Sequence, residues 1–288
     1  MSSEPVISIY GPGLLGGSVA LAVLERMPGV RVRFWARRES AEAQIRERGI
    51  EAEFFTDPAS AAVGASLIIL CTPVETMPAL AHAIAGAELT EDCLVTDVGS
   101  VKGDVVRALE PVLGARFLGS HPMAGSEKTG INVARADLFE NAACLLTPTT
   151  DTQPASLERL RRFWKALGCR ILEFGPDEHD EKVARISHLP HMMAAVTTLA
   201  ALRGDPDAIA CVAGGFRDTT RVAAGDPGLW TGIAMGNRLA LVSRLKEAAS
   251  TLSELVSLLE NADEAALRQF LAEAKVLRDM VRPLPPKP

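Results

Sequence analysis

Four short segments contain side chains that could carry out chemistry. They are residues 96–102 (TDVGSVK), 119–127 (GSHPMAGSE), 187–191 (SHLPH) and 216–221 (FRDTTR), and the first two follow predicted strands. The imidazole of His121 can accept a proton at neutral pH, because its ordinary pKa lies near 6.5. By residue type alone, such a histidine is more often a core or capping residue, and that alternative stays open. The segments favour proton transfer on a small molecule.

The segment IYGPGLLGGSVA, residues 9–20, places Gly11, Gly13 and Gly16 at the spacing G-x-G-x-x-G. It lies between an apolar run and a predicted helix, which is the context that a dinucleotide-binding loop requires. We expect Gly11 to permit the tight turn, Gly13 to let the backbone approach a pyrophosphate and Gly16 to let the helix pack close to the sheet. A glycine-rich turn without a ligand is the alternative. Four further residues are assigned to the cofactor site: Leu14, Leu15, Thr72 and Pro73.

The residues after the second predicted strand bear on which dinucleotide binds. In NAD-binding domains an Asp or Glu normally binds the ribose hydroxyls here, whereas this sequence reads Phe34-Trp35-Ala36-Arg37-Arg38. Two guanidinium groups suit the 2′-phosphate of NADP, because they donate charge-assisted hydrogen bonds. We therefore predict that NADP is preferred, with NAD as the second choice. The alternative is that Arg37 and Arg38 are only solvated residues at the start of a helix.

The first part of the chain alternates short apolar runs with helical stretches, which predicts a parallel sheet. Helices are expected between the strands, for example over residues 14–27 and 157–167. This order predicts an α/β, doubly wound Rossmann-type domain over residues 1–176. The predicted strands are residues 6–10, 30–35, 67–72, 94–98, 116–120, 143–147 and 169–174.

After residue 176 the β-branched runs disappear, and Ala- and Leu-rich segments predict an all-helical domain over residues 177–288. Two apolar seams follow the helical period, and the second one follows a helix start at Asp263. Such seams pack either inside a domain or between subunits, and we expect a homodimer through this domain. The seams are Val242, Leu245, Ala249, Leu252, Val256 and Leu259, and Leu267, Phe270, Leu271, Ala274 and Leu277.

Composition disfavours several function classes. The net charge is −6 and the 30 Lys and Arg residues are spread along the 288-residue chain, which argues against nucleic-acid binding. The longest mostly apolar run, residues 59–74, is too short and too interrupted for a membrane helix. No export signal is visible, so we expect a cytoplasmic protein. The five cysteines are far apart and form no C-x-x-C pair, which predicts neither disulfides nor a metal site.

Several motifs resemble, in their order, those of the prephenate and arogenate dehydrogenases of tyrosine biosynthesis. They are GPGLLGGS, TDVGSVK, SHPMAGSEKTG, SHLPHMM, GGFRDTTRVA and GDPGLW, and they extend over nearly the whole chain. The resemblance implies that hydride leaves the carbinol carbon of a cyclohexadienol and passes to NAD(P), and that the ring carboxylate leaves as carbon dioxide. It does not distinguish prephenate from arogenate.

The resemblance also implies roles for individual residues. His121 is the base, and Ser100 is its orienting partner, which bridges the histidine, the substrate and the nicotinamide of the cofactor. Arg221 holds the ring carboxylate with its planar guanidinium group. His191 contacts the substrate, and His188, three residues earlier, faces the same site. The other substrate-site assignments are Arg217, which shares a face with Arg221 if the segment is helical, Trp230, Ser126 and Glu127.

Other interpretations compete with these roles. The two arginines could form a surface ion-pair cluster, and Trp230 could simply fill a junction between helices. The whole chain could be an NADP-dependent dehydrogenase of the β-hydroxyacid type, although such enzymes usually have a catalytic lysine where this chain has residues 187–191. It could also be a non-catalytic NADP-binding sensor that kept the fold. The combination of His121, Ser100 and Arg221 favours the enzyme.

Overall fold

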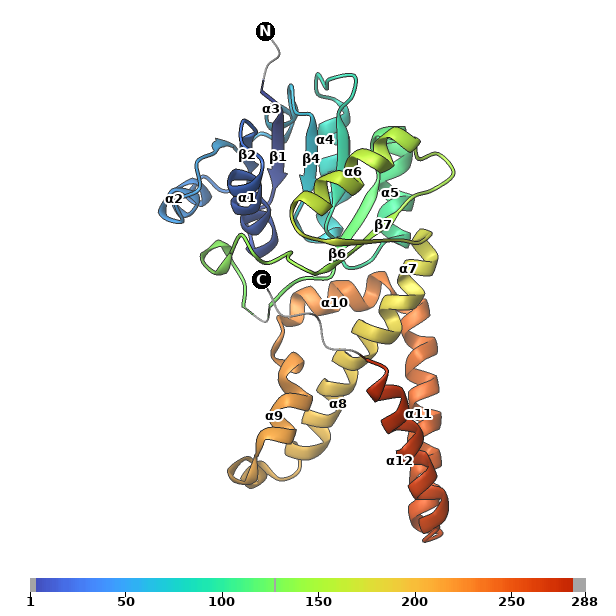
Figure 1. Cartoon of the computed structure of the whole chain (residues 1–288). Coiled ribbons are helices and arrows are strands. Elements are labelled where there is room, and N and C mark those ends of the chain that lie inside the picture. Colours follow the sequence, from blue (N-terminus) through green and yellow to red (C-terminus); the bar gives the residue numbers. More distant parts are fainter. Residues whose placement is uncertain (1–3, 127, 282–288) are drawn as a thin grey trace.

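The structure, a computed structural model, describes residues 4–126 and 128–281. Its first part is built on five parallel strands in the order β3-β2-β1-β4-β5 (Figure 1). The chain moves outward from β1 to one side and later from β4 to the other, so the sheet is doubly wound, as predicted. The carboxyl ends of β1 and β4 form the switch point. The strands are β1 (Val6–Tyr10), β2 (Arg31–Trp35), β3 (Glu53–Phe55), β4 (Leu67–Leu70) and β5 (Leu94–Asp97).

Three more strands form a second sheet in the order β6-β7-β8, and one of them breaks the parallel pattern. They are β6 (Gly119–Pro122), β7 (Ala143–Thr147) and β8 (Arg170–Glu173), and a parallel bridge between Val95 and Phe117 connects them to β5. β7 runs antiparallel to β6, so the expectation of a purely parallel sheet is wrong here. In its described residues, the connection from β6 to β7 contains a 3-10 turn and no crossover helix, and parallel pairing needs such a crossover.

Two other details differ from the sequence analysis. The strand expected at residues 116–120 begins at Gly119, because Gly114–Arg116 forms a 3-10 turn. β3 was not expected at all. It contains only three residues, too few to produce a periodic signal.

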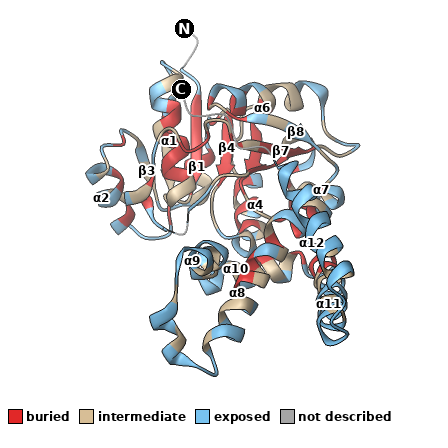
Figure 2. Ribbon diagram, turned by 60° about the horizontal axis from the view of Figure 1, so that its bottom comes forward, coloured by how far each residue is buried: buried red, intermediate tan, exposed pale blue. Residues whose placement is uncertain are grey.

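Helices cover both faces of the sheet, and the strands between them are buried (Figure 2). On one face, Val19 of α1 and Phe163 of α6 pack against Ile7. On the other face, Met77 of α4 and Leu109 of α5 share a core with Tyr10. The helices of this part are α1 (Leu14–Arg26), α2 (Ser40–Glu47), α3 (Pro58–Ala62), α4 (Met77–Ala85), α5 (Gly103–Leu113) and α6 (Pro154–Ala166).

The part described from Pro176 onward is helical, as predicted (Figure 1). α7 continues through a π-helical turn, Ala184–His188, directly into α8. α12 begins after Asp263, whose side chain accepts a hydrogen bond from the amide of Ala266. The helices are α7 (Pro176–Val183), α8 (Leu189–Leu202), α9 (Gly214–Thr220), α10 (Pro227–Gly236), α11 (Arg238–Glu260) and α12 (Glu264–Asp279).

The apolar seam on α11 is largely exposed in the single chain. Leu252 is 52% exposed and Leu259 60% exposed, although both belong to the predicted seam. On α12, Leu267 and Phe270 are half-buried, whereas Leu271 and Leu277 of the same seam are 56% and 58% exposed. The α11 seam therefore does not serve as core within one chain. None of the described helices combines the length and the apolar character that crossing a membrane would require.

We expect Gly16→Ala to destabilise the protein. A Cβ at residue 16 would lie 2.1 Å from the carbonyl oxygen of Gly11, which is backbone and cannot move freely. Overpacking of this kind costs about 1–3 kcal/mol, which lowers Tm by roughly 3–10 °C. Gly13→Ala is the matched control, because a Cβ at residue 13 meets nothing within 4 Å. Thermal unfolding that gave equal Tm values for the two variants would contradict the packing argument.

Candidate active site

The glycine loop between β1 and α1 has the geometry of a nucleotide-binding loop. Gly11 has φ of +105°, which favours glycine, and Gly16 lies too close to the Gly11 carbonyl to carry a side chain. The space beside Gly13 is open. α1 begins at Leu14, so its first amides can receive an anion at this point.

Thr72 lies beside this loop and has an unsatisfied hydroxyl. A Cβ on Gly11 would come within 3.1 Å of its methyl group. Its Oγ1 is buried without a hydrogen-bond partner among the described residues, and such a group costs about 1–3 kcal/mol unless a ligand or water satisfies it. The hydroxyl and the open space fit a bound nucleotide. Of the other predicted cofactor residues, Leu14 and Leu15 are half-buried at the start of α1, and Pro73 is exposed.

Arg37 and Arg38 lie near the same loop. The amide of Gly11 donates a 3.0 Å hydrogen bond to the carbonyl of Trp35, the last residue of β2. The two arginines follow two and three residues later, and both are exposed. Their guanidinium groups are therefore available at the edge where the ribose of a dinucleotide lies in such folds.

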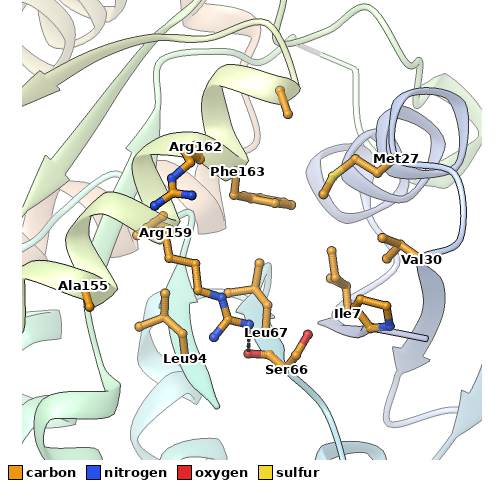
Figure 3. A pocket seen from close by; sticks show the side chains of 13 residues that line it. Ile7, Met27, Val30, Ser66, Leu67, Leu94, Ala155, Arg159, Arg162 and Phe163 are labelled. Carbon is orange, nitrogen blue, oxygen red and sulfur yellow. Dashed lines mark hydrogen bonds between the residues drawn. The ribbon is translucent and has the colours of Figure 1, made fainter. Parts of the chain in front are cut away.

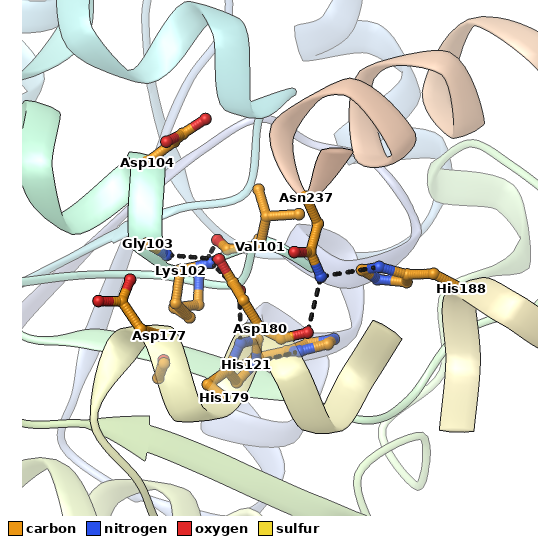
Figure 4. A network of polar contacts seen from close by, with 12 residues as sticks. Val101, Lys102, Gly103, Asp104, His121, Asp177, His179, Asp180, His188 and Asn237 are labelled. Carbon is orange, nitrogen blue, oxygen red and sulfur yellow. Dashed lines mark hydrogen bonds and ion pairs between the residues drawn. The ribbon is translucent and has the colours of Figure 1, made fainter. Parts of the chain in front are cut away.

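His121 on β6 is the first member of a chain of three buried side chains (Figure 4). Its Nδ1 lies 2.9 Å from Nε2 of His179, and Nδ1 of His179 lies 2.9 Å from Oδ1 of Asp180. Both His179 and Asp180 belong to α7, so the chain crosses from the sheet to the helical part.

Asp180 also holds the start of α5. Its two carboxylate oxygens accept hydrogen bonds of 2.8 Å from the amides of Lys102 and Gly103. Burial favours the neutral acid, but the hydrogen bonds from His179 and from these amides outweigh it, and the pKa of Asp180 is lowered. The group is a carboxylate at the N-terminus of a helix, where negative charge is stabilised.

The charge on Asp180 fixes the protons on both histidines. A carboxylate only accepts, so Nδ1 of His179 carries a proton and its Nε2 has a lone pair. Nδ1 of His121 must then donate to that lone pair, which leaves Nε2 of His121 free to act as a base. Burial, with contributions from His179, Lys102 and His188, lowers the pKa of His121 well below 6.5. His121 is therefore neutral at physiological pH.

A buried ion pair shapes the loop that carries Ser100. The ammonium of Lys102 bonds to Oδ2 of Asp97, and both side chains are fully buried. The same carboxylate accepts hydrogen bonds from the amide of Gly99 at 2.8 Å and from the amide of Ser120, beside His121, at 3.3 Å. Ser100 is thus held between the end of β5 and the strand that carries the base.

The π-helical turn brings three histidines to one side of the helix formed by α7 and α8. In a regular α-helix, His179 and His188 would lie about 180° apart, at about 100° per residue. The turn accommodates one extra residue, which reduces the angle to roughly 80° for His188 and roughly 20° for His191. Pro190 lies in the first turn of α8, and the helix continues through it.

His191 packs on Trp230 of α10. The ring centroids are 3.3 Å apart and the planes are inclined by 20°. Gly225 makes this stack possible, because a Cβ there would lie 2.6 Å from Nε1 of Trp230. Both ring nitrogens of His191 are buried without a partner among the described residues. Burial lowers the pKa of His191, and the nearby Val222 backbone only partly opposes this shift.

Three further predicted residues, Arg217, Arg221 and Ser126, lie at the surface. Arg221 is exposed at the start of the 3-10 turn Arg221–Ala224, which packs on α8. α9 ends at Thr220 and continues directly into this 3-10 turn, so Arg217 lies on α9 and Arg221 at the start of the turn. Ser126 is exposed, and its Oγ accepts a 3.1 Å hydrogen bond from the amide of Lys128. Glu127 lies outside the described residues.

The sequence analysis missed three residues that complete this site: His179, Asp180 and Asn237. The first two lie in the charged run PDEHDEK, which is typical of a solvated helix. Asn237 lies between α10 and α11 and donates to the Asp180 carbonyl at 2.7 Å. No motif in the sequence marks it. In the part of the chain that the structure describes, no group of three or more His, Cys, Asp or Glu side chains could hold a metal ion.

Among the cavities of the described part, two flank the sheet and lie outside the histidine cluster. A cavity of about 380 Å³ between the two parts of the chain is lined by Asp104, Asp177, Asp180 and Asn237, among others. A mostly apolar cavity of about 630 Å³ lies between α1 and α6 and includes Leu67 and Leu94 (Figure 3). Because these two leucines begin β4 and β5, the larger cavity lies at the amino ends of the strands, away from the glycine loop.

Comparison with known proteins gives consistent matches. The family model described as "Prephenate dehydrogenase, nucleotide-binding domain" matches residues 19–173, and "Prephenate dehydrogenase, dimerization domain" matches residues 175–273. Prephenate dehydrogenase of Bacillus subtilis is 33% identical over 96% of this chain and 76% of its own length. Cyclohexadienyl dehydrogenase of Zymomonas mobilis is 32% identical over 94% of both chains.

Solved structures agree. Prephenate dehydrogenase from A. aeolicus, in complex with hydroxyphenyl propionate and NAD+, has a TM-score of 0.89 at 30% identity, over 96% of this chain and 98% of that one. Synechocystis arogenate dehydrogenase has a TM-score of 0.82 at 34% identity, over 96% of this chain and 100% of that one. Because both family models match and together span most of the sequence, this chain belongs to the prephenate dehydrogenase family.

Proposed function

We propose that this protein catalyses the oxidative decarboxylation of prephenate or arogenate, with NADP as the preferred cofactor. The observation that supports it best is the cluster of buried, neutral histidines. His121 comes from the sheet, His188 and His191 come from the helical part, and the Ser100 backbone interacts with the His188 ring. The unsatisfied ring nitrogens in this cluster require a ligand or water, and a small polar ring supplies such partners.

The chemistry explains why a neutral histidine is needed. Nε2 of His121 takes the proton of the ring hydroxyl while the carbinol carbon loses hydride, and a ketone forms. The carboxylate then leaves as carbon dioxide, and its bonding electrons make the ring aromatic with negative charge on the same oxygen. That oxygen takes the proton back from His121, so His121 returns to its neutral form. A nicotinamide bound at the glycine loop supplies the hydride acceptor.

The other residues bind and orient the substrate in this proposal. Ser100 orients the hydroxyl beside His121. Arg221 holds the ring carboxylate, because a guanidinium matches its two oxygens. His191 and Trp230 form a wall, with the His191 nitrogens available to polar groups of the substrate. His188 contacts the substrate from the same side as His191, and the outer contacts are assigned to Arg217, Ser126 and Glu127.

The NADP preference rests on Arg37 and Arg38. Both are exposed beside the glycine loop, and no acidic residue separates them from the end of β2. Binding of the pyrophosphate falls to Gly11, Gly13 and the first amides of α1.

We also propose that the chain forms a homodimer through the helical part. The α11 seam leaves Leu252, Val256 and Leu259 exposed along one helix. A contiguous apolar stripe of this kind is typical of a subunit interface. The match of residues 175–273 to a dimerization domain supports the same assembly.

The central test compares the wild type with His121→Asn. We expect the wild type to reduce NADP+ when prephenate or arogenate is added, and the variant to lose about 100-fold or more in kcat with little change in cofactor affinity. His82→Asn, an exposed histidine of α4, is the control.

Because the pKa of His121 lies below 6.5, its neutral form persists at lower pH, and the acid limb of the wild-type kcat profile is expected below pH 6.5. If the wild type turned over neither substrate, the proposed function would be contradicted. An unchanged kcat in His121→Asn would show that His121 is not the base.

Arg221→Ala is expected to raise KM for the substrate about 10-fold or more and to change kcat less. A charge-assisted pair to a carboxylate is lost, which is a binding interaction made before the chemical step. Arg217→Ala serves as the comparison, because it removes an arginine four residues away. If KM rises in the Arg217 variant and not in the Arg221 variant, the carboxylate is held by Arg217.

Arg37→Ala is expected to weaken NADP+ binding about 10-fold while changing NAD+ binding less than twofold. The variant removes a partner of the 2′-phosphate, which NAD+ lacks. Arg46→Ala, an exposed arginine of α2, is the control. Fluorescence titration with each cofactor measures the two Kd values. Equal weakening of both cofactors would mean that Arg37 does not contact the 2′-phosphate.

A further inference from the structure

Asn237 has a fixed orientation. One of its side-chain terminal atoms lies 2.7 Å from the carbonyl oxygen of Asp180 and 3.2 Å from Nδ1 of His188 (Figure 4). A carbonyl oxygen only accepts hydrogen bonds, so this atom is the amide nitrogen, Nδ2. The same nitrogen therefore donates to His188.

This donation fixes the proton on His188. Nδ1 must accept, so the single ring proton of the neutral imidazole lies on Nε2. His188 is 1% exposed, and burial lowers its pKa to about 4, so the ring stays neutral across the physiological range. Nε2–H makes no hydrogen bond of full geometry among the described residues, although the Ser100 backbone interacts with the ring and makes a minor opposing contribution to its pKa. A buried donor without a partner is costly, which indicates that a bound molecule satisfies it.

The surroundings of His188 indicate which atom of the bound molecule accepts this hydrogen bond. The Ser100 backbone lies near its ring, and charge on His188 would lower the pKa of His121. Trp230 packs against it edge-on, with ring centroids 6.2 Å apart. His188 thus lies with the base and with Ser100, at the end of the site where the proposed function requires the ring oxygen.

We propose that His188 is a catalytic residue that donates its Nε2–H to the ring oxygen, and that Asn237 is the positioning residue that keeps this proton on Nε2. The assignment rests on the proposed function. The ring oxygen gains negative charge twice, as its proton leaves for His121 and again as carbon dioxide departs. A preorganised neutral donor stabilises both charges, in the manner of an oxyanion hole. His121 and His188 then face one oxygen with opposite tautomers, one as acceptor and one as donor.

The first test removes the donor. His188→Phe keeps an aromatic ring of similar shape, and we expect kcat to fall about 100-fold with KM changed less than threefold, because the lost bond is strongest in the transition state. The control is His82→Phe on the exposed face of α4. Cofactor Kd, titrated without substrate, is expected to stay unchanged. A weakened cofactor Kd with unaltered kcat would show that Nε2–H serves the cofactor and would overturn the proposal.

The second test reverses the tautomer while keeping the shape. In Asn237→Asp the new carboxylate accepts from Nδ1–H of His188, which leaves a lone pair on Nε2 and lowers kcat near neutral pH. The carboxylate also raises the pKa of His188 from about 4, so lowering the pH protonates the ring and restores Nε2–H. The other groups near His188 are unchanged between this variant and the wild type. They are Asp180, His179, His191, His121 and the Ser100 backbone.

The pH profile separates positioning from simple destabilisation. We expect the kcat of Asn237→Asp, divided by that of the wild type at the same pH, to rise as the pH falls toward 5. A ratio that stays constant with pH, in a variant that remains folded by circular dichroism, would contradict the role of Asn237. Wild-type turnover is measured in the same series, so a failure of the proposed function appears as inactive wild type, whereas a failure of this inference leaves the wild type active.

Discussion

The buried carboxylate of Asp180 is the constraint on which the rest of the site depends. A charge taken out of water must be paired or fully hydrogen-bonded, and this carboxylate obtains its partners from both parts of the chain. The amides of Lys102 and Gly103 come from the start of α5, and the imidazole of His179 comes from its own helix. The same bonds therefore fasten the helical part to the sheet and hold His121, two bonds away, in one tautomer.

Burial explains why the cluster works with neutral groups. His121, His188 and His191 are each at most 6% exposed, and burial is the largest cause of the lowered pKa of each. A cationic imidazole would make a poor base, and several of them would repel one another. Since the rings are neutral, their chemistry is decided by which nitrogen holds the proton, and neighbouring hydrogen bonds decide that. Asp180 acts on one ring through His179, and Asn237 acts on another directly.

Some of the unsatisfied polar atoms lie where the proposed function needs ligands. Thr72 Oγ1 lies at the glycine loop, and nitrogens of His188 and His191 lie at the histidine cluster. By contrast, the cavity of about 630 Å³ between α1 and α6 lies at the opposite edge of the sheet and is lined mainly by apolar side chains. In this molecule, buried polar atoms without partners therefore point to the proposed site, whereas the volume of the larger cavity does not.

The sequence alone determined the glycine loop, the doubly wound sheet and the helical second half, because these follow from local periodicity and from backbone demands at Gly11 and Gly16. It also singled out His121, His188 and His191, whose roles remain predictions. Only the tertiary structure decided the antiparallel pairing of β7, the exposed seam on α11 and the partners His179, Asp180 and Asn237. Contacts between segments distant in sequence leave no local pattern. The proton positions on the histidines depend on those contacts, because each tautomer is set by a neighbour from another element.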